Sequence, residues 1–440
     1  MQNIIKKIIL ILTFLILVFG IYFGYTFYKN SQNTNQTSTK TINTNPGRTP
    51  FQTRVSTSTE VKTIIEGGNE VINPTTTIST TKPRLVELWK EPVSGFDFVY
   101  KDIEVLATST NNSSTTIIEN VKNKKILKNQ EFIYLWDRKT GHIYENLAST
   151  TEINKIANYT LPEVEEAYFI DNSSLITRKL ESDNDTITTN YLKLTKEFST
   201  STVYITDIKN IAIDSDNISY SKIEKKIFYL INKTGKGILS TIDGNTRKNI
   251  INTTLSEWLS QYVNKNTIAL TTKPSAYFKG YLFLLNTDGS SKNTYIIGEK
   301  YGFNTLTSPD GKKVIYNEII NNTLETFIYD IKSKSSTYLS QATIVDKCVW
   351  SNDSKKIFCG IPQTLYQAPY PDDWYKNQTS FSDNMWSIDP ETGEFTLTIA
   401  LQDQISKPID VYHISISNDN RYMIFQDKNT LSLWKYDLVY

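Results

Sequence analysis

Cysteine, histidine and net charge are all scarce in this chain of 440 residues, which has two cysteines, two histidines, and 47 basic against 46 acidic side chains. A net charge near +1 lacks the electrostatic signature of a nucleic-acid or polyanion binder, so we expect no nucleic-acid partner. Two cysteines are too few for a disulfide-rich scaffold or a four-cysteine zinc site. The histidines, His142 and His413, stand in different parts of the chain, so we expect no metal site and no cofactor.

The common catalytic motifs are missing as well. The sequence has no G-x-S-x-G nucleophile elbow and no G-x-x-x-x-G-K-[ST] phosphate loop. Two aspartate pairs, Asp183/Asp185 and Asp214/Asp216, have the D-x-D spacing that binds calcium only when further oxygen ligands lie nearby. Solvated turn residues are the simpler interpretation of these pairs. The sequence therefore predicts that the protein is not an enzyme.

Long apolar runs are absent except for one near the N-terminus, from Ile8 to Tyr28. About 21 residues at roughly 1.5 Å each span about 31 Å, the thickness of a bilayer core. Lys6 and Lys7 precede the run as they would in a signal peptide, but aromatic residues crowd its exit where small residues would mark a cleavage site. We predict an uncleaved transmembrane helix with the N-terminus cytoplasmic and the rest of the chain outside the cytoplasm.

The segment from residue 30 to residue 82 is rich in Ser, Thr, Asn and Gln and nearly free of aromatic residues. Such a segment buries too little apolar surface to offset its ordering entropy, so we predict a disordered linker. Residues 61–65 could pair transiently, but a tether is the favoured interpretation. The predicted divisions are residues 1–29 for a cytoplasmic tip and transmembrane helix, 30–82 for the linker and 83–440 for a folded domain.

Strand-forming residues dominate the folded domain. The chain has 27 Tyr and 19 Phe, and its apolar runs after residue 84 are short and broken by turn residues, which favours an all-β fold. The clearest exception is the stretch 255–263, where Leu255, Trp258, Leu259 and Tyr262 fall at helical spacing and predict a short helix.

Two signals repeat along this domain. The first is a turn of the type Ser-x-Asp followed by an alternating strand, and its copies begin at Ser308, Ser351 and Ser417. The second is an apolar pair followed by an acidic or polar residue and a turn, and it recurs every 43 to 59 residues, at Asp137, Thr195, Asp243, Asn286, Asp330, Asp389 and Asp437. This interval is close to the roughly 40–50 residues of a propeller blade, so we predict a β-propeller. Seven blades are favoured, with six or eight as alternatives.

The phase of the repeat predicts how the ring closes. Only three residues follow Asp437, so the last blade lacks its outer strand. The segment from Leu85 to Trp89 precedes the first full unit and could supply that strand, which would leave no long open edge.

The Ser-Pro-Asp-Gly-Lys-Lys turn at Ser308 and its following strand resemble the repeats of TolB-like and WD-repeat propellers. Over almost the whole domain the chain also resembles a group of bacterial proteins with one N-terminal membrane helix and a propeller. The stretches that carry this second resemblance include Pro92 to Phe96, Thr140 to Glu145, Lys347 to Ser351, Tyr370 to Tyr375 and Phe381 to Trp386. The resemblance implies fold and location and brings no catalytic residues with it.

The two cysteines can be placed by the spacing of one turn. If Trp350 faces Ile357 across the turn that begins at Ser351, then Cys348 falls opposite Cys359, with both side chains on one face. A disulfide is then within reach, and it is favoured over two buried thiols if the domain lies outside the cytoplasm.

One blade carries an insertion. The turns at Ser308 and Ser351 are 43 residues apart, whereas those at Ser351 and Ser417 are 66 apart. The excess is rich in aromatic residues, which suit recognition because each ring combines an apolar face with a polar tip. The alternative is a rigid plug packed on the blade below. The predicted contact residues are Tyr366, Tyr370, Asp372, Asp373, Trp374, Tyr375, Phe381 and Trp386.

These observations predict a single-pass protein of the cell membrane that holds lipid through its N-terminal helix and presents a propeller outside the cytoplasm. By fold analogy we expect a module that binds or scaffolds an envelope protein or polysaccharide. The alternative is a surface-tethered, carbohydrate-active hydrolase with carboxylates from separate blades. Two or three carboxylates at one mouth of the funnel would favour the hydrolase, and a lining of Tyr, Asn and Thr would favour binding.

Overall fold

The computed structural model describes a hairpin at residues 56–66 and 69–79, and then residues 84–106, 125–157, 159–182, 186–196, 203–215, 217–231, 233–255, 257–290 and 293–438. The chain forms two compact units, residues 1–80 and 81–440. The predicted transmembrane helix, from Ile8 to Tyr28, lies outside the described residues. Within the described ranges, no helix combines the length and the apolar character needed to cross a bilayer.

The first unit contains an antiparallel hairpin in which β1 (Ser56–Glu66) pairs with β2 (Asn69–Ser79). It lies inside the segment predicted to be a disordered linker, residues 30–82. Thr, Val and Ile are frequent in both strands, and these β-branched residues favour extended backbone even where little apolar surface is available for burial. The remainder of the linker segment lies outside the described residues.

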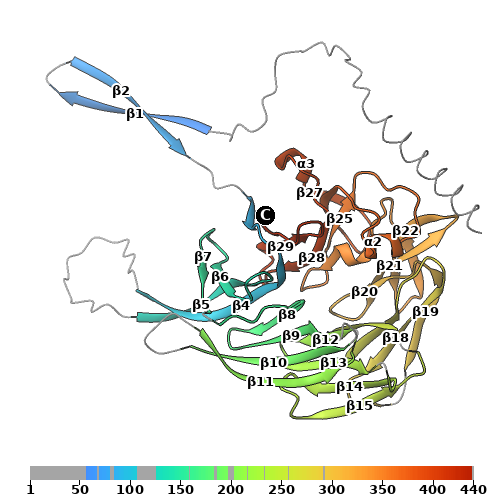
Figure 1. Cartoon of the computed structure of the whole chain (residues 1–440). Helices are drawn as coiled ribbons and strands as arrows, with labels where there is room; N and C mark the ends of the chain where they lie inside the picture. The colour runs from blue at the N-terminus through green and yellow to red at the C-terminus, as the bar shows by residue number, and fades with distance from the viewer. Residues whose placement is uncertain are drawn as a thin grey trace, which may run out of the picture. The chain divides into compact units, whose positions relative to one another are not determined.

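The second unit is a seven-bladed β-propeller, the blade number that the repeats favoured. It consists of seven four-stranded antiparallel sheets arranged around a common centre (Figure 1). The first four blades take their strands in chain order. Blade 1 is β4 (Val93–Leu106), β5 (Lys125–Asp137), β6 (Ile143–Leu147) and β7 (Ile153–Lys155). Blade 2 is β8 (Glu166–Asp171), β9 (Ser174–Leu180), β10 (Ile187–Lys196) and β11 (Val203–Ile213). Blade 3 is β12 (Ile218–Ser221), β13 (Lys226–Ile231), β14 (Lys236–Thr241) and β15 (Arg247–Asn252). Blade 4 is β16 (Trp258–Asn264), β17 (Thr267–Thr272), β18 (Lys279–Asn286) and β19 (Thr294–Tyr301).

The last three blades complete the ring and carry the short helices. Blade 5 is β20 (Thr305–Thr307), β21 (Lys313–Ile320), β22 (Thr323–Asp330) and β23 (Ser335–Tyr338). Blade 6 is β24 (Cys348–Trp350), β25 (Ile357–Pro362), β26 (Asp383–Ile388) and β27 (Phe395–Ile399). Blade 7 is β28 (Val411–Ile416), β29 (Tyr422–Asp427), β30 (Leu433–Asp437) and β3 (Leu85–Trp89). The helices are η1 (Val345–Lys347), α2 (Asp372–Tyr375) and α3 (Leu401–Gln404).

The ring closes as the phase of the repeat predicts. Strand β3, from the start of the domain, pairs antiparallel with β30 from its end, with Val86 opposite Lys435. The guanidinium of Arg84 donates two hydrogen bonds to the carbonyl oxygen of Asp437, at 3.0 and 2.9 Å. The two ends of the domain are therefore held in one sheet, and β3 completes the last blade to four strands like the others.

The first strand of each blade lies innermost, because first strands of neighbouring blades touch one another, as β4 does β8 and β12 does β16. The hydrophobic core lies between adjacent sheets rather than inside one of them. Between blades 6 and 7, for example, Phe358 and Met385 pack with Val411 and Phe425. This arrangement leaves the side chains of the inner strands to line a central lumen.

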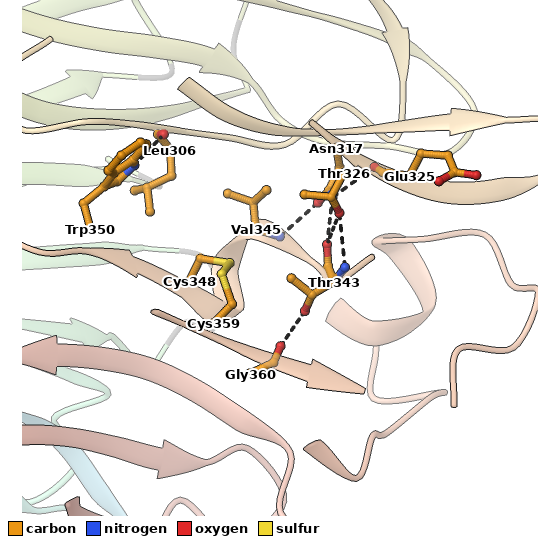
Figure 2. The surroundings of a disulfide bond; sticks show 10 residues. All are labelled: Leu306, Asn317, Glu325, Thr326, Thr343, Val345, Cys348, Trp350, Cys359 and Gly360. Carbon is orange, nitrogen blue, oxygen red and sulfur yellow. Dashed lines mark hydrogen bonds between the residues drawn. A yellow bond between two sulfur atoms is a disulfide. The ribbon is translucent and has the colours of Figure 1, made fainter. Parts of the chain in front are cut away.

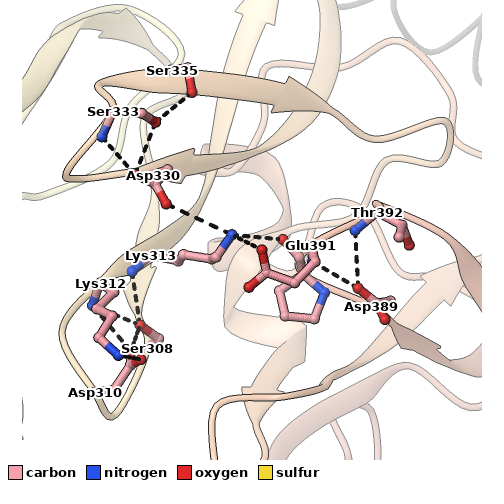
Figure 3. Close-up of polar contacts among 11 residues, drawn as sticks. Ser308, Asp310, Lys312, Lys313, Asp330, Ser333, Ser335, Asp389, Glu391 and Thr392 are labelled. Carbon is pink, nitrogen blue, oxygen red and sulfur yellow. Dashed lines mark hydrogen bonds and ion pairs between the residues drawn. The ribbon is translucent and has the colours of Figure 1, made fainter.

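The repeated turns are closed by their own side chains. At Ser308 the hydroxyl donates to Asp310 Oδ1 at 2.6 Å and accepts the backbone N–H of Lys313 at 2.9 Å (Figure 3). The turns at Ser351 and Ser417 repeat the serine-to-aspartate bond. Lys313 also reaches Glu391 at 2.9 Å, so a turn of blade 5 is tied to one of blade 6 (Figure 3).

The helix expected over 255–263 is wrong: most of that stretch is β16, the inner strand of blade 4. Its backbone pairs with β17, with Tyr262 opposite Ile268. The helical spacing of the apolar residues was coincidental, because of the four residues at that spacing only Trp258 is buried, and Leu255 is exposed. Pairing with the following strand outweighs a short local pattern.

Candidate functional site: the lumen

The inner strands enclose a cavity of about 390 Å³ at the centre of the propeller. A second cavity, of about 220 Å³, adjoins it and shares Glu166, Tyr168 and His413 with it. We call the polar and aromatic residues that line the larger cavity and carry the argument below the lumen site: Glu166, Tyr168, Arg178, Asp346, Tyr375, Tyr412 and His413. Five of these residues come from strands of blades 2 and 7, and Asp346 and Tyr375 come from η1 and α2.

Blade 2 contributes a charged pair to the lumen site. Arg178 Nη1 lies 2.5 Å from Glu166 Oε2, and the hydroxyl of Tyr168 donates to the same oxygen at 2.6 Å. A further N–H of Arg178 donates to the carbonyl oxygen of Ser215 at 2.6 Å, and the guanidinium is buried. The carboxylate of Glu166 is therefore held in one orientation by a cation and a phenol on its Oε2 side.

The smaller cavity contains a second carboxylate, Asp97, whose two oxygens are both occupied. Its Oδ1 accepts the hydroxyl of Ser415 at 2.9 Å, and its Oδ2 lies 2.5 Å from the ammonium of Lys222. The ring of Tyr220 stands beside that of Tyr168, with centroids 5.3 Å apart. Asp97 thus serves to tie blades 1, 3 and 7 together around the lumen.

Asp346 brings a third carboxylate to the lumen from η1. Its Oδ2 accepts two hydrogen bonds, from the hydroxyl of Tyr375 at 2.5 Å and from the amide of Asn304 at 2.7 Å. Burial raises the pKa of Asp346 above its usual value, and the two hydrogen bonds oppose that rise. A proton on this carboxyl is therefore easier to retain than on an exposed aspartate.

The disulfide and its surroundings hold η1 in place. Cys348 pairs with Cys359 across β24 and β25, and their sulfur atoms are 2.08 Å apart (Figure 2). The backbone N–H of Val345 donates to Asn317 Oδ1 at 2.9 Å (Figure 2). The register that the sequence predicted, with Trp350 opposite Ile357, is the one observed.

Blade 7 supplies two stacked rings through an irregular strand. The pairing of β28 with β29 slips between Tyr412 and Ser415, and His413 has a φ of 43°, in the left-handed region that non-glycine residues rarely adopt. The rings of Tyr412 and His413 stack with centroids 3.7 Å apart. Such bulges turn a side chain away from its regular direction, and here the imidazole lines the lumen.

Burial acts on both of these rings although the lumen is open to water. It lowers the pKa of His413, with the charge of Glu166 and a hydrogen bond to Gln426 opposing it. His413 is therefore neutral at pH 7. Burial also raises the pKa of Tyr412, so its phenol keeps its proton. His413 and Tyr375 are each surrounded by protein atoms and yet exposed to solvent, as expected for side chains that line a channel.

Behind Asp346 lies a fully buried charge cluster. The ammonium of Lys347 is 2.6 Å from Asp383 and 2.6 Å from Asp410. The indole N–H of Trp374 donates to Asp410 Oδ2 at 3.0 Å. We call these four residues the Lys347 cluster. It joins the insertion to η1 and to the start of blade 7.

Two carboxylates share one ammonium in the Lys347 cluster. Burial raises the pKa of Asp383 to about 6, with Lys347 lowering it and Asp410 raising it further. No hydrogen bond from the described residues reaches Oδ1 of Asp383, so that oxygen is free to carry the proton when the carboxyl is protonated.

The predicted contact residues of the insertion do not form one surface. Tyr370, Trp374 and Phe381 are buried and pack with Ile344 and Leu324, so for these three the contact hypothesis is wrong. The reason is that the insertion folds back onto blades 5 to 7 and uses these rings as its own core. This is the plug that the sequence left as the alternative.

The other predicted contact residues differ in exposure and lie in different places. Tyr366 is 73% exposed, and Trp386 is half-buried opposite Cys359 in blade 6. Asp373 is half-buried within the insertion. Asp372 accepts the backbone N–H of Ala276 at 2.6 Å, and with Tyr375 it borders an open groove of about 770 Å³. Only Tyr375 reaches the lumen site.

The remaining sequence candidates carry no site. Asp183, Asp185 and Asp216 lie outside the described residues, and Asp214 is 2.5 Å from the ammonium of Lys233. In the part of the chain that the structure describes, no group of three His, Cys, Asp or Glu side chains is arranged to hold a metal ion. His142 lies at a turn of blade 1, 3.2 Å from the hydroxyl of Thr160.

Apart from Tyr375 and His413, the sequence did not single out the lumen residues. The signal was nevertheless present, because three of them, Asn304, Asp346 and Tyr412, stand four or five residues before the turn serine of their blade. That offset places a residue on the inner strand, or just before it, where side chains meet at the centre of the ring.

No protein-family model matches this sequence, and neither does any curated protein. Among solved structures the chain is similar to TolB from Acinetobacter baumannii, with 10% identity and a TM-score of 0.39, over 78% of this chain and 80% of that one. It is similar to oligogalacturonate lyase from Vibrio parahaemolyticus, with 10% identity and a TM-score of 0.44, over 70% and 86% of the two chains. It is also similar to the tricorn protease, with 8% identity and a TM-score of 0.45, over 70% of this chain and only 32% of that one. Similarities of this size carry no argument about function.

Proposed function

We propose that this protein is a membrane-anchored, extracytoplasmic propeller that binds a polar component of the cell envelope, a protein or a polysaccharide, in its lumen. The observation that carries the proposal is the lumen site itself. It is a cavity within the range of about 300–1,000 Å³ that ligand pockets occupy, and polar side chains from separate blades line most of it. The strained His413 at its wall supports the same conclusion, since such strain is retained where it serves a site.

The location rests on two features of the sequence and one of the fold. The apolar run from Ile8 to Tyr28 has the length of a bilayer span, and the lysines before it favour a cytoplasmic N-terminus. The disulfide between Cys348 and Cys359 supports an oxidising compartment, because cytosolic thiols are kept reduced.

A hydrolase is the second candidate, and Asp346 is the residue that favours it. A carboxyl whose pKa is raised by burial, in the same cavity as an ion-paired carboxylate such as that of Glu166, is the arrangement from which general acids are made. Two of the three lumen carboxylates are, however, paired with the protein's own cations, Arg178 and Lys222, which suits fixed orientation and binding.

Topology and binding are tested on the full-length chain in its own cells. Protease added to intact cells should cut within residues 30–82 and release the propeller; survival until lysis would place the domain in the cytoplasm.

Crosslinking in intact cells should capture an envelope component with the native chain and with Tyr366→Ala, whose ring lies outside the lumen. It should fail with Tyr412→Ala. Equal capture by both variants would remove the lumen as the binding site. New reducing ends released from envelope polysaccharide, and lost with Asp346→Asn, would favour the hydrolase.

A further inference from the structure

Most hydrogen-bond donors around the lumen are used within the protein; among the described residues, the hydroxyl of Tyr412 and Nδ2 of Asn217 are exceptions. Each of the following side chains directs its N–H or O–H group to another protein atom at 3.3 Å or less: Tyr168 to Glu166, Arg178 to Glu166 and Ser215, Tyr375 to Asp346, Asn304 to Asp346 and Tyr375, and Gln261 to the carbonyl oxygen of Thr307. A ligand in this cavity therefore meets few groups that can still donate a hydrogen bond to it.

Two acceptors remain open. Glu166 uses Oε2 for both of its partners, and Asp346 uses Oδ2 for both of its own. Among the described residues no hydrogen bond reaches Glu166 Oε1 or Asp346 Oδ1, and neither atom is buried without a partner, so both are open to the solvent of the lumen. Both residues line the same cavity.

The charges and the aromatic rings around the lumen also suit a positively charged ligand. Three carboxylates at the described lumen, Asp97, Glu166 and Asp346, stand against two cations, Arg178 and Lys222, which leaves one net negative charge when all are ionised. The neutral ring of His413 adds no positive charge. The rings of Tyr168, Tyr375 and Tyr412 also line the cavity, and the face of such a ring attracts a cation.

From these contacts we propose that the lumen site takes an organic cation, a primary ammonium or a guanidinium group, between Glu166 Oε1 and Asp346 Oδ1. Such a group has only donors, so it satisfies the two open acceptors without requiring a donor that the protein has already used. Its charge balances the excess carboxylate, and its methylene stem packs against the rings of Tyr412 and Tyr375. The inference rests on the proposed function, since it names the chemistry of the ligand in that same cavity.

The test compares charged probes with uncharged partners of nearly the same shape. Isothermal titration calorimetry on the full-length chain in detergent uses butylamine against butanol, Nα-acetyl-lysine amide against its Nε-acetylated form, and glucosamine against glucose. In each pair the amine should bind at least about tenfold more tightly, the factor that one charge-assisted hydrogen bond supplies. Which amine binds best distinguishes a free amine, a basic side chain of a peptide and an amino sugar as the source of the cation.

Two variants locate the effect. Asp346→Asn keeps an oxygen for Tyr375 and Asn304 but removes the charge and replaces the open acceptor by an NH2 group, so it should weaken butylamine binding at least about tenfold with little change in melting temperature. Asp403→Asn is the matched control on α3, where the carboxylate is exposed, and should bind as the native chain does. If Asp346→Asn does not fold, Glu166→Gln with the same probes replaces it.

The outcomes separate this inference from the proposed function. Equal or tighter binding of the uncharged member of each pair would overturn the cation and keep the lumen as a ligand site. Amine binding that survives both Asp346→Asn and Glu166→Gln would place the cation elsewhere and overturn the inference too. The loss of envelope crosslinking in Tyr412→Ala tests the proposed function independently of any amine.

Discussion

The replacement of Trp374 by alanine tests whether the insertion is a plug held by its own core. The Trp374 side chain is wholly buried, its N–H bonds Asp410, and its ring meets that of Tyr412 edge-on at 5.7 Å. Removal of a buried tryptophan costs about 3–5 kcal/mol, and the hydrogen bond lost to a buried carboxylate adds about 1 kcal/mol. The free energy of unfolding should therefore fall by about 4–6 kcal/mol. At roughly 2 °C per kcal/mol for a domain of this size, the melting temperature should fall by about 8–12 °C.

The assay is thermal unfolding of the full-length chain followed by near-ultraviolet circular dichroism. Trp374→Phe separates the two contributions, because it keeps an aromatic ring in the core and removes the N–H that bonds Asp410. Tyr366→Ala is the control in the same insertion: its ring is 73% exposed, and its replacement should change stability by less than about 0.5 kcal/mol. A fall for Trp374→Ala no larger than that of the control would refute the assignment of this ring to the core.

Three further outcomes are expected. Replacement of both Cys348 and Cys359 by serine should lower the free energy of unfolding by about 2–3 kcal/mol, since the sequence separation of 11 closes a short loop; urea titration that finds no difference from the native chain would contradict this. Because the folded-state pKa of Asp383 is raised to about 6, the folded protein binds its proton more tightly than the unfolded chain does, so this contribution to stability is lost as pH rises through 6. Relative to Asp383→Asn, the free energy of unfolding of the native chain should rise by about 1 kcal/mol between pH 7 and pH 5, and a constant difference would rule out the raised pKa of Asp383. Deletion of residues 85–89 removes the outer strand of blade 7 and should cost several degrees of melting temperature, whereas an unchanged value would show that the ring needs no such closure.

Local pattern by itself determined the architecture of this protein. Turn serines and aspartates mark the start of the second strand in the blades that carry them, and their hydrogen bonds lie within five residues of one another, so they form wherever the sequence occurs. The period of two along a strand then fixed which residues face each other, which placed Cys348 opposite Cys359 before any tertiary contact was known. The missing strand after Asp437 likewise followed from counting, because a sheet with an open edge needs a partner.

Only the tertiary structure decided what the residues at the centre and in the insertion do. Glu166 and Asp346 belong to different blades and meet in one cavity because ring closure turns every inner strand toward the same axis, which no local pattern records. The insertion was ambiguous for a similar reason, since an aromatic ring suits a core and a binding surface equally well. Whether the insertion is core or binding surface depended on Lys347 and Asp410. They directly precede the inner strands of neighbouring blades, β24 and β28, and both contact the side chain of Trp374. The strand β16 was missed because its pairing partner, and not its own spacing of apolar residues, sets its backbone.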